Sequence, residues 1–159
     1  MAIPNVDTVS FIVLCEGRLL VERRSLNART DPGIIAIPGG HIQRGESLVE
    51  AVQRELREET GLNCDSFTLI AKKYHSTPLE NQTVYYYLCN NWVGELDCNE
   101  ADELFWISLD EIDLLDYEIE REAVDELRKH LLTLARAPPT IRLHPCATCS
   151  VRSHGSEGG

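Results

Sequence analysis

The chain has 159 residues, of which 43% are hydrophobic and 26% are charged, as expected for one soluble globular domain. Its formal net charge of −11 disfavours nonspecific binding to nucleic acid, which needs a basic surface. No apolar run approaches a membrane span, and the first residues lack the basic start and apolar stretch of a signal peptide, so we expect a cytoplasmic protein.

The N-terminal part of the chain is expected to be β structure. Residues 6–15 and 18–22 read as two strands around a turn at Glu16-Gly17. A polar loop at 25–32 precedes a short strand at 34–37. Pro38-Gly39-Gly40 and Gly45 then bracket a turn in which backbone groups can approach a ligand closely.

Residues 47–61 predict one helix with both ends marked. Ser47 and Glu50 form a capping box, and the thirteen residues that follow Ser47 contain no Gly or Pro. Gly61 stands where a left-handed residue usually ends a helix. At about 100° per residue, a core-facing stripe is expected to comprise Leu48, Val49, Val52 and Leu56.

Three glutamates of this helix point to a metal ion. Glu55 and Glu58 border the apolar stripe, and Glu59 falls on its edge, where an unpaired carboxylate is costly. Their i, i+3, i+4 spacing also makes them repel one another. Bound Mg2+ or Mn2+, which take hard oxygen ligands, would offset both costs. The alternative is a solvated acidic face paired with Arg54 and Arg57.

The C-terminal half predicts more strands and then helices. Residues 67–74, 83–93 and 105–108 read as strands, 110–115 as a short helix, and 118–136 as an amphipathic helix. The order predicts an α+β fold with a mixed sheet between helices, in one domain over residues 1–136. Residues 137–159 are expected to be a flexible tail. Cys146 and Cys149, with His144 and His154, could bind a soft metal, pair as a disulfide, or be close by accident.

Residues 40–62 read G-x5-E-x7-R-E-L-x-E-E-x-G-L, and this segment resembles the Nudix box at every specified position. The matching residues are Gly40, Glu46, Arg54, Glu55, Leu56, Glu58, Glu59, Gly61 and Leu62. Residues 19–24 and 35–40 resemble the usual approach to the box, and 102–109 resemble the late strand of MutT-like members. The resemblance implies the Nudix α/β/α sandwich and cleavage of the diphosphate linkage of a nucleoside diphosphate derivative.

The resemblance and the clustered acids together suggest roles for individual residues. Glu55, Glu58 and Glu59 are the expected ligands of Mg2+ or Mn2+, and the family places a further ligand at the Gly39 carbonyl. The ion would neutralise the diphosphate and lower the pKa of a bound water. The residues expected to brace the loop and helix are Glu46, Arg54, Gly40 and Gly61. The general base is left open between Glu55, Glu100 and Glu103.

The substrate is less readable than the reaction. We expect a nucleotide-type small molecule, foremost a nucleoside or deoxynucleoside triphosphate giving NMP and pyrophosphate. ADP-ribose or a nucleotide sugar is the alternative, because Pro78 stands sixteen residues after Leu62, as in the family's ADP-ribose hydrolases. A catalytically silent nucleotide-binding regulator is the alternative of another class. Candidate substrate contacts are Arg23, Tyr74, Pro78 and Trp106. The oligomeric state stays open, a homodimer included.

Overall fold

The computed structural model describes residues 2–136 and 151–152. Its strands are β1 (Asn5–Ile12), β2 (Leu14–Cys15), β3 (Arg18–Arg23), β4 (Ile35–Ala36), β5 (Gly39–His41), β6 (Phe67–Ser76), β7 (Asn81–Cys89), β8 (Leu96–Asp97), β9 (Glu103–Ser108) and β10 (Val151–Arg152). Its helices are α1 (Leu48–Thr60), the 3-10 helix η1 (Leu109–Leu114) and α2 (Glu118–Ala135). The expected α+β class is confirmed.

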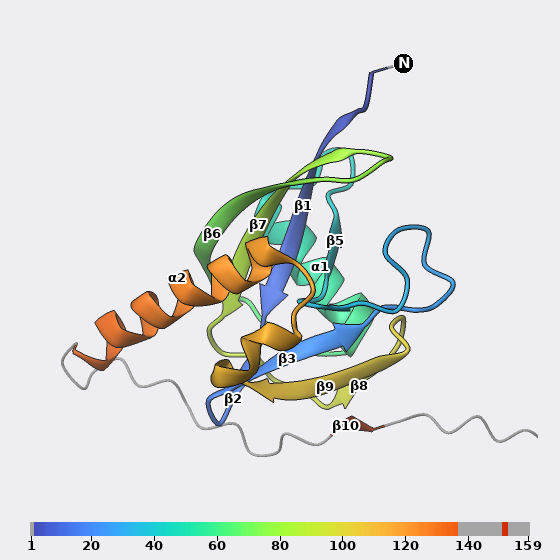
Figure 1. The fold of residues 1–159 in the computed structure, drawn as a ribbon. Helices are drawn as coiled ribbons and strands as arrows, with labels where there is room; N and C mark the ends of the chain where they lie inside the picture. Colours follow the sequence, from blue (N-terminus) through green and yellow to red (C-terminus); the bar gives the residue numbers. More distant parts are fainter. Residues whose placement is uncertain (1, 137–150, 153–159) are drawn as a thin grey trace, which may run out of the picture.

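The strands form a central mixed sheet and a second sheet beside it (Figure 1). The central sheet has the order β5-β1-β7-β6, in which β1 runs parallel to β7 and the other pairs are antiparallel. In the second sheet β3 pairs with β2, β4 and β9, all antiparallel. The short strand β10 pairs with β8 in parallel.

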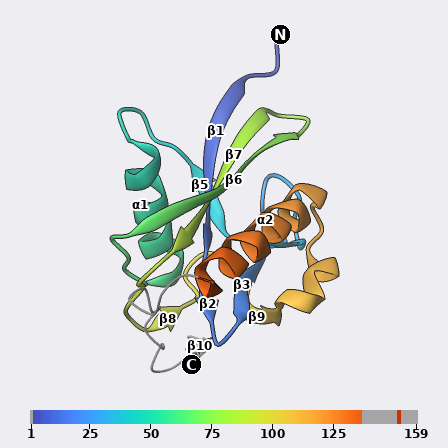
Figure 2. The same cartoon turned by 90° about the vertical axis from the view of Figure 1, so that its left-hand side faces the viewer.

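The two long helices cover opposite faces of the central sheet, which gives the expected sandwich (Figure 2). β1 contributes to both hydrophobic clusters, because successive side chains of a strand point to opposite faces. Val9 and Phe11 pack with Leu56 of α1, whereas Ile12 packs with Val124 of α2. The sheet core is therefore buried on both sides, and α1 is held firmly against β1 and β5.

Helix α1 begins and ends where the sequence predicts. The Ser47 hydroxyl accepts a hydrogen bond from the Glu50 amide at 3.1 Å, and the Glu50 carboxylate accepts one from the Ser47 amide at 2.8 Å. Gly61 caps the helix with a φ of 72°. Val52 and Leu56 are fully buried, but Val49 is 46% exposed, so its placement in the core stripe was wrong. Val49 lies in the first turn at the margin of the buried arc, which includes Ala51.

The other differences from the predicted elements are local. The expected strand 6–15 breaks at Val13, and 83–93 ends at Cys89. The strand Gly39–His41 was not predicted, because glycine is depleted in strands. Cys146 and Cys149, with almost all of the predicted tail, lie outside the described residues. Within the described ranges no helix is both long and apolar enough to cross a membrane.

Candidate active site

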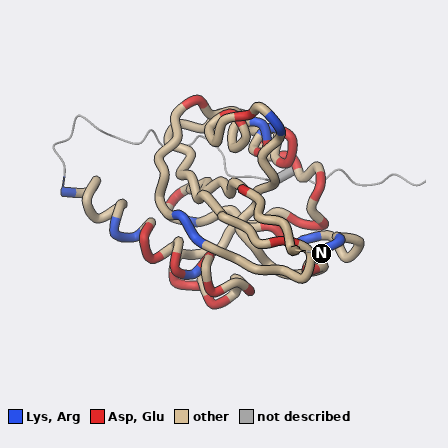
Figure 3. The backbone as a smooth tube through the Cα atoms, turned by 90° about the horizontal axis from the view of Figure 1, so that it is seen from above, with Lys and Arg blue, Asp and Glu red and all other residues tan. Residues whose placement is uncertain are grey.

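A cavity of about 660 Å³ opens between α1, the strands of both sheets and the start of α2. Its lining is strongly acidic, and Asp and Glu are the more frequent charged residues along the backbone (Figure 3). The acidic residues that line the cavity are Glu22, Asp31, Glu55, Glu58, Glu59, Glu100 and Glu120. Of these carboxylates, those of Glu55 and Glu58 form a first set, which contacts Arg54 together with Glu46.

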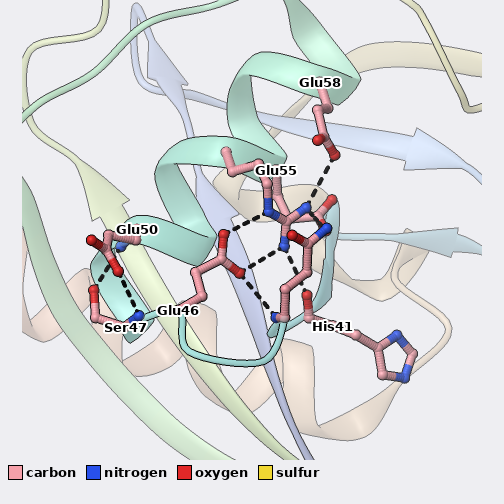
Figure 4. Close-up of polar contacts among 8 residues, drawn as sticks. His41, Glu46, Ser47, Glu50, Glu55 and Glu58 are labelled. Atoms are coloured by element: carbon pink, nitrogen blue, oxygen red, sulfur yellow. Dashed lines mark hydrogen bonds and ion pairs between the residues drawn. The ribbon is translucent and has the colours of Figure 1, made fainter.

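The carboxylates of Glu46, Glu55 and Glu58, which Figure 4 labels, all contact the guanidinium group of Arg54. Arg54 Nε lies 2.7 Å from Glu46 Oε1, and Nη1 lies 2.8 Å from Glu55 Oε1 and 3.1 Å from Glu58 Oε2. Arg54 Nη2 also donates to the His41 carbonyl at 3.0 Å. Glu46 and Arg54, both expected to brace the loop and helix, thus form an ion pair, and the Arg54 hydrogen bond holds the pKa of Glu46 below its usual value. One side chain therefore ties the loop, β5 and α1 together.

Close approach of β5 to α1 explains the glycine at position 40. A Cβ atom there would lie 2.3 Å from Glu55 Oε1, which no side chain could accommodate without moving the carboxylate. The backbone of the Gly39-Gly40 segment and the carboxylate of Glu55 therefore share one small space. Such a space suits a small cation with carbonyl and carboxylate ligands.

Glu59 differs from the Arg54-bound glutamates, because it is only 8% exposed. Its Oε2 atom is buried and has no hydrogen-bond partner among the described residues. Burial, together with the charges of Glu22, Glu55 and Glu100, raises the pKa of Glu59 well above its ordinary value. Such a buried, unsatisfied carboxylate oxygen is costly unless a ligand completes it.

Glu100 is brought to the same cavity by the loop before β9. The neighbouring Asn99 donates from its backbone to the Glu59 carbonyl at 3.2 Å and from its side chain to the Glu58 carbonyl at 3.1 Å. These two hydrogen bonds fasten the loop to the last turn of α1. Of the two acids proposed in this region, Glu100 lines the cavity and Glu103 does not.

Glu22 is a cavity residue that sequence reasoning missed. It is 8% exposed, and burial raises its pKa to about 7. Glu22 and Arg24 line the cavity, whereas Arg23, between them, pairs with Glu103 at 3.5 Å and lies over the Phe105 ring. The alternation of side chains along a strand explains this division. A glutamate inside the apolar run of residues 19–22 was the available signal.

The buried end of the cavity, near α2, carries a second orphaned carboxylate. Glu120 Oε1 accepts a hydrogen bond from the Ile37 amide at 3.0 Å, but its buried Oε2 lacks a partner among the described residues. Arg24 Nε is likewise buried and unpartnered within the described chain. Nearby, the rings of His75 and Tyr117 pack 4.5 Å apart. This end therefore offers an acceptor, a donor and aromatic surface.

None of the four residues predicted to contact substrate lines the cavity. Arg23 faces away, Tyr74 is 70% exposed on β6, and Trp106 packs against the hydrophobic cluster on the α1 side. Pro78 lies in the β6–β7 turn, where its neighbour Thr77 reaches the cavity instead. The predicted ligand residues that do line the cavity are Gly39, Glu55, Glu58 and Glu59.

The donor set fits a hard divalent cation, judged by the orphaned oxygen of Glu59 and the close approach at Gly40. Within residues 2–136 and 151–152, no three His, Cys, Asp or Glu side chains already meet as a ligand group. Arg54 accounts for part of this, because it engages Glu55 and Glu58. A cation here would share those two carboxylates with Arg54.

Comparison with known proteins agrees with this geometry. The family model for the NUDIX domain matches residues 4–127. The 8-oxo-dGTP diphosphatase of Escherichia coli K12 is 33% identical over 91 residues, 57% of this chain and 70% of that protein. The 8-oxo-dGTP diphosphatase of Haemophilus influenzae is 32% identical over 79 residues, 50% of this chain and 58% of that protein.

A solved MutT protein from Methanosarcina mazei Go1 superposes with a TM-score of 0.74 at 26% identity, covering 82% of this chain and 98% of that one. The fold, the Nudix box and the cavity therefore support the same family assignment. The chain belongs to the NUDIX domain family and is a hydrolase that acts on phosphoric anhydride bonds.

Proposed function

We propose that this chain is a Mg2+- or Mn2+-dependent pyrophosphohydrolase that converts a nucleoside or deoxynucleoside triphosphate into NMP and pyrophosphate. The observation that carries the proposal is the cavity itself. It joins the carboxylates of α1 to a buried polar end near α2, which supports a substrate with phosphates at one end and a nucleoside at the other. The names of the two relatives, both 8-oxo-dGTP diphosphatases, support a triphosphate substrate.

Nudix hydrolases generally need a divalent ion, which neutralises the diphosphate and lowers the pKa of a bound water. Glu55, Glu58 and Glu59 would hold the ion, with the carbonyl of Gly39. Arg54 orients two of these carboxylates through its bonds to Glu55 and Glu58. Orientation of this kind matters because a ligand held in place loses less entropy on binding.

The proton of the attacking water needs an acceptor within the cavity. Glu55 and Glu100 line the cavity, so we retain these two as candidates for the general base. Glu103 pairs with Arg23 outside the cavity and is not carried forward in this role. Burial raises the pKa of Glu55, which brings a carboxylate closer to the range where it accepts a proton efficiently near neutral pH.

The nucleoside would lie toward Glu120 and Arg24. A base edge carries both hydrogen-bond donors and acceptors, and the orphaned Glu120 Oε2 and Arg24 Nε could pair with such an edge. The loop around Asp31 is held near this end by a hydrogen bond from the Tyr117 hydroxyl to the Asp31 carboxylate. A cytoplasmic location and a homodimer stay predictions from the sequence.

The proposal is tested with purified chain and a substrate panel, with Mg2+, with Mn2+ and with EDTA. The panel comprises dNTPs, oxidised dNTPs, ADP-ribose and nucleotide sugars. NMP with pyrophosphate is the expected product pair, lost in EDTA. AMP and ribose 5-phosphate as products would identify ADP-ribose, and not a triphosphate, as the substrate. Tight nucleotide binding without turnover, with either metal, would instead identify a regulator.

A further inference from the structure

Glu22 of β3 is a buried carboxylate whose ion pair with Arg24 is long. Its side chain is 10% exposed, and Arg24 Nη1 lies 3.9 Å from Glu22 Oε1, at the outer limit of an ion pair. Burying a carboxylate requires a close cation or several hydrogen bonds, otherwise the charge destabilises the fold. The position therefore needs an explanation beyond strand formation.

Glu22 faces the carboxylates of α1 from the second sheet. Burial and the nearby charge of Glu22 raise the pKa of Glu59. Burial raises the pKa of Glu22, which Arg24 lowers in part and Glu100 and Glu55 raise further. All four residues line the same cavity. Acidic residues alone do not make a site, but Glu59 Oε2 is buried, unpartnered among the described residues, and belongs to this cluster. An orphaned oxygen among like charges is the arrangement that a cation would stabilise.

Among the described residues, arginine side chains offset the charge of this cluster only in part. Arg54 is bound to Glu46, Glu55 and Glu58 at the outer edge of α1. Arg24 Nη1 lies 3.9 Å from Glu22, and its Nη2 donates to Thr30 at 3.3 Å. The charge of Arg24 therefore opposes the effect of burial on Glu22 only in part, and Glu59 Oε2 is unpartnered among the described residues.

We propose that Glu22 is a metal-ligating residue, which with Glu59 and Glu100 binds a divalent cation on the inner side of α1. The inference rests on the proposed function, because the ion would belong to the same phosphate-hydrolysing site. Carboxylate oxygens from β3, α1 and the loop before β9 supply hard ligands, and water completes the coordination of Mg2+ or Mn2+. The ion would lie on the side of α1 that faces away from Arg54.

The test is a Mn2+ titration of the metal-free full chain without nucleotide, followed by electron paramagnetic resonance and calorimetry. Glu22→Gln keeps the size and removes the charge. It is expected to lose one bound Mn2+ or to bind it at least about tenfold more weakly. The matched control is Glu126→Gln, which removes the same charge from the surface of α2 outside the cavity and should bind Mn2+ as wild type does. Wild-type stoichiometry and affinity in Glu22→Gln would overturn the proposal.

Thermal unfolding distinguishes a metal ligand from a purely structural glutamate, because the two predict different changes in melting temperature. In EDTA, Glu22→Gln should unfold at a higher temperature than wild type, because repulsion and burial of charge are relieved. Added Mn2+ should raise its melting temperature less than that of wild type. A lower melting temperature in EDTA with an unchanged Mn2+ response would contradict the proposal and assign Glu22 a structural role.

A further variant covers the case in which Glu22→Gln does not fold. Glu22→Asp retains the charge and should bind Mn2+ more weakly than wild type, whereas wild-type affinity would argue against ligation by Glu22. Because nucleotide is absent, these results are separable from hydrolysis. If Mn2+ binding depends on Glu22 but no substrate is hydrolysed, only the proposed function is contradicted. If substrate is hydrolysed but Mn2+ binding does not depend on Glu22, only the role of Glu22 is contradicted.

Discussion

Arg54 binds Glu46, Glu55 and Glu58 on α1 and the loop before it. Inside the cavity, Glu22 has a long 3.9 Å contact with Arg24, and Glu59 Oε2 has no partner among the described residues. We call the first three residues, with Arg54, the Arg54 group, and Glu22, Glu59 and Glu120 the inner carboxylates. Arg54 offsets part of the negative charge of the first group. The second group raises the energy of the folded chain until something binds. Removing a charge should therefore have opposite effects on stability in the two groups.

The largest effect is expected for Glu59→Gln, an inner carboxylate. Loss of a direct metal ligand should lower kcat/KM by more than about 100-fold, beyond the usual effect of residues behind the ligands. The metal-free variant should unfold at a higher temperature, because an unpartnered buried charge has gone. Steady-state kinetics at limiting Mg2+ and thermal unfolding in EDTA measure the two effects.

The matched control for that variant is Glu126→Gln, on the surface of α2 beside Lys129, which should change neither property. Wild-type turnover of Glu59→Gln at limiting metal would rule out Glu59 as a ligand. A lower melting temperature in EDTA would show that Glu59 stabilises the fold, and the distinction between the two groups would fail at this residue.

Arg54→Gln should lower activity and stability together. The variant leaves Glu46, Glu55 and Glu58 without their common partner, at a cost of about 1–3 kcal/mol in the free energy of unfolding. Turnover should fall about 10–100-fold, because the carboxylates lose their orientation. Arg54→Lys should recover little, since an ammonium cannot reproduce the forked contacts. Urea unfolding measures the change in stability, and steady-state kinetics measures the change in turnover. An unchanged unfolding midpoint would contradict the role of Arg54 in bracing the loop and helix.

The Arg54 group was predictable from the sequence, and the inner carboxylates largely were not. Glu46, Arg54 and Glu55 are close along the chain, so helical geometry and the Nudix box placed them together. Glu22 and Glu120 come from β3 and α2, and only the packing of two sheets and two helices brings them to one cavity. The sequence pattern also does not specify which individual side chain of a strand enters the cavity.

The two arginines of β3 and its end show this. Arg23 was one of four predicted substrate contacts, but strand alternation turns Arg23 toward Glu103 and places Arg24 in the cavity lining. Likewise, β5 was read as a turn because its two glycines disfavour strands, although its pairing with β1 holds Gly39 beside Ser10. Which face of a strand is buried depends on contacts with distant segments, which local sequence does not specify.

The raised pKa values of the inner carboxylates also predict how the stability of the metal-free chain changes with pH. Burial raises the pKa of Glu22 from 4.5 to about 7, so the folded chain binds a proton that the unfolded chain releases across this range. Stability in EDTA should therefore fall as the pH rises from about 4.5 to 7. At about 1.4 kcal/mol per pKa unit, the loss is on the order of 3 kcal/mol.

Glu59 and Glu120, whose pKa values are also raised by burial, act in the same direction. Urea unfolding in EDTA between pH 5 and 7.5 measures the slope, and saturating Mn2+ should reduce it. Glu22→Gln should flatten it in part. Stability that instead increases with pH over this range would mean that the inner carboxylates are already neutralised within the metal-free protein.

The smallest effect is expected at the start of α1, where Ser47→Ala removes the capping hydrogen bond. The free energy of unfolding should fall by about 1 kcal/mol. Neither Ser47 nor Glu50 lines the cavity, and the glutamates lie in the last two turns, held by Arg54 and by packing on β1 and β5. Turnover and Mn2+ affinity should therefore stay within about twofold of wild type, since a lost cap acts on its own turn. A parallel loss of turnover would show that the helix start sets the carboxylate positions through Glu46 and Arg54, so that stability and ligand binding could not be assigned to separate groups.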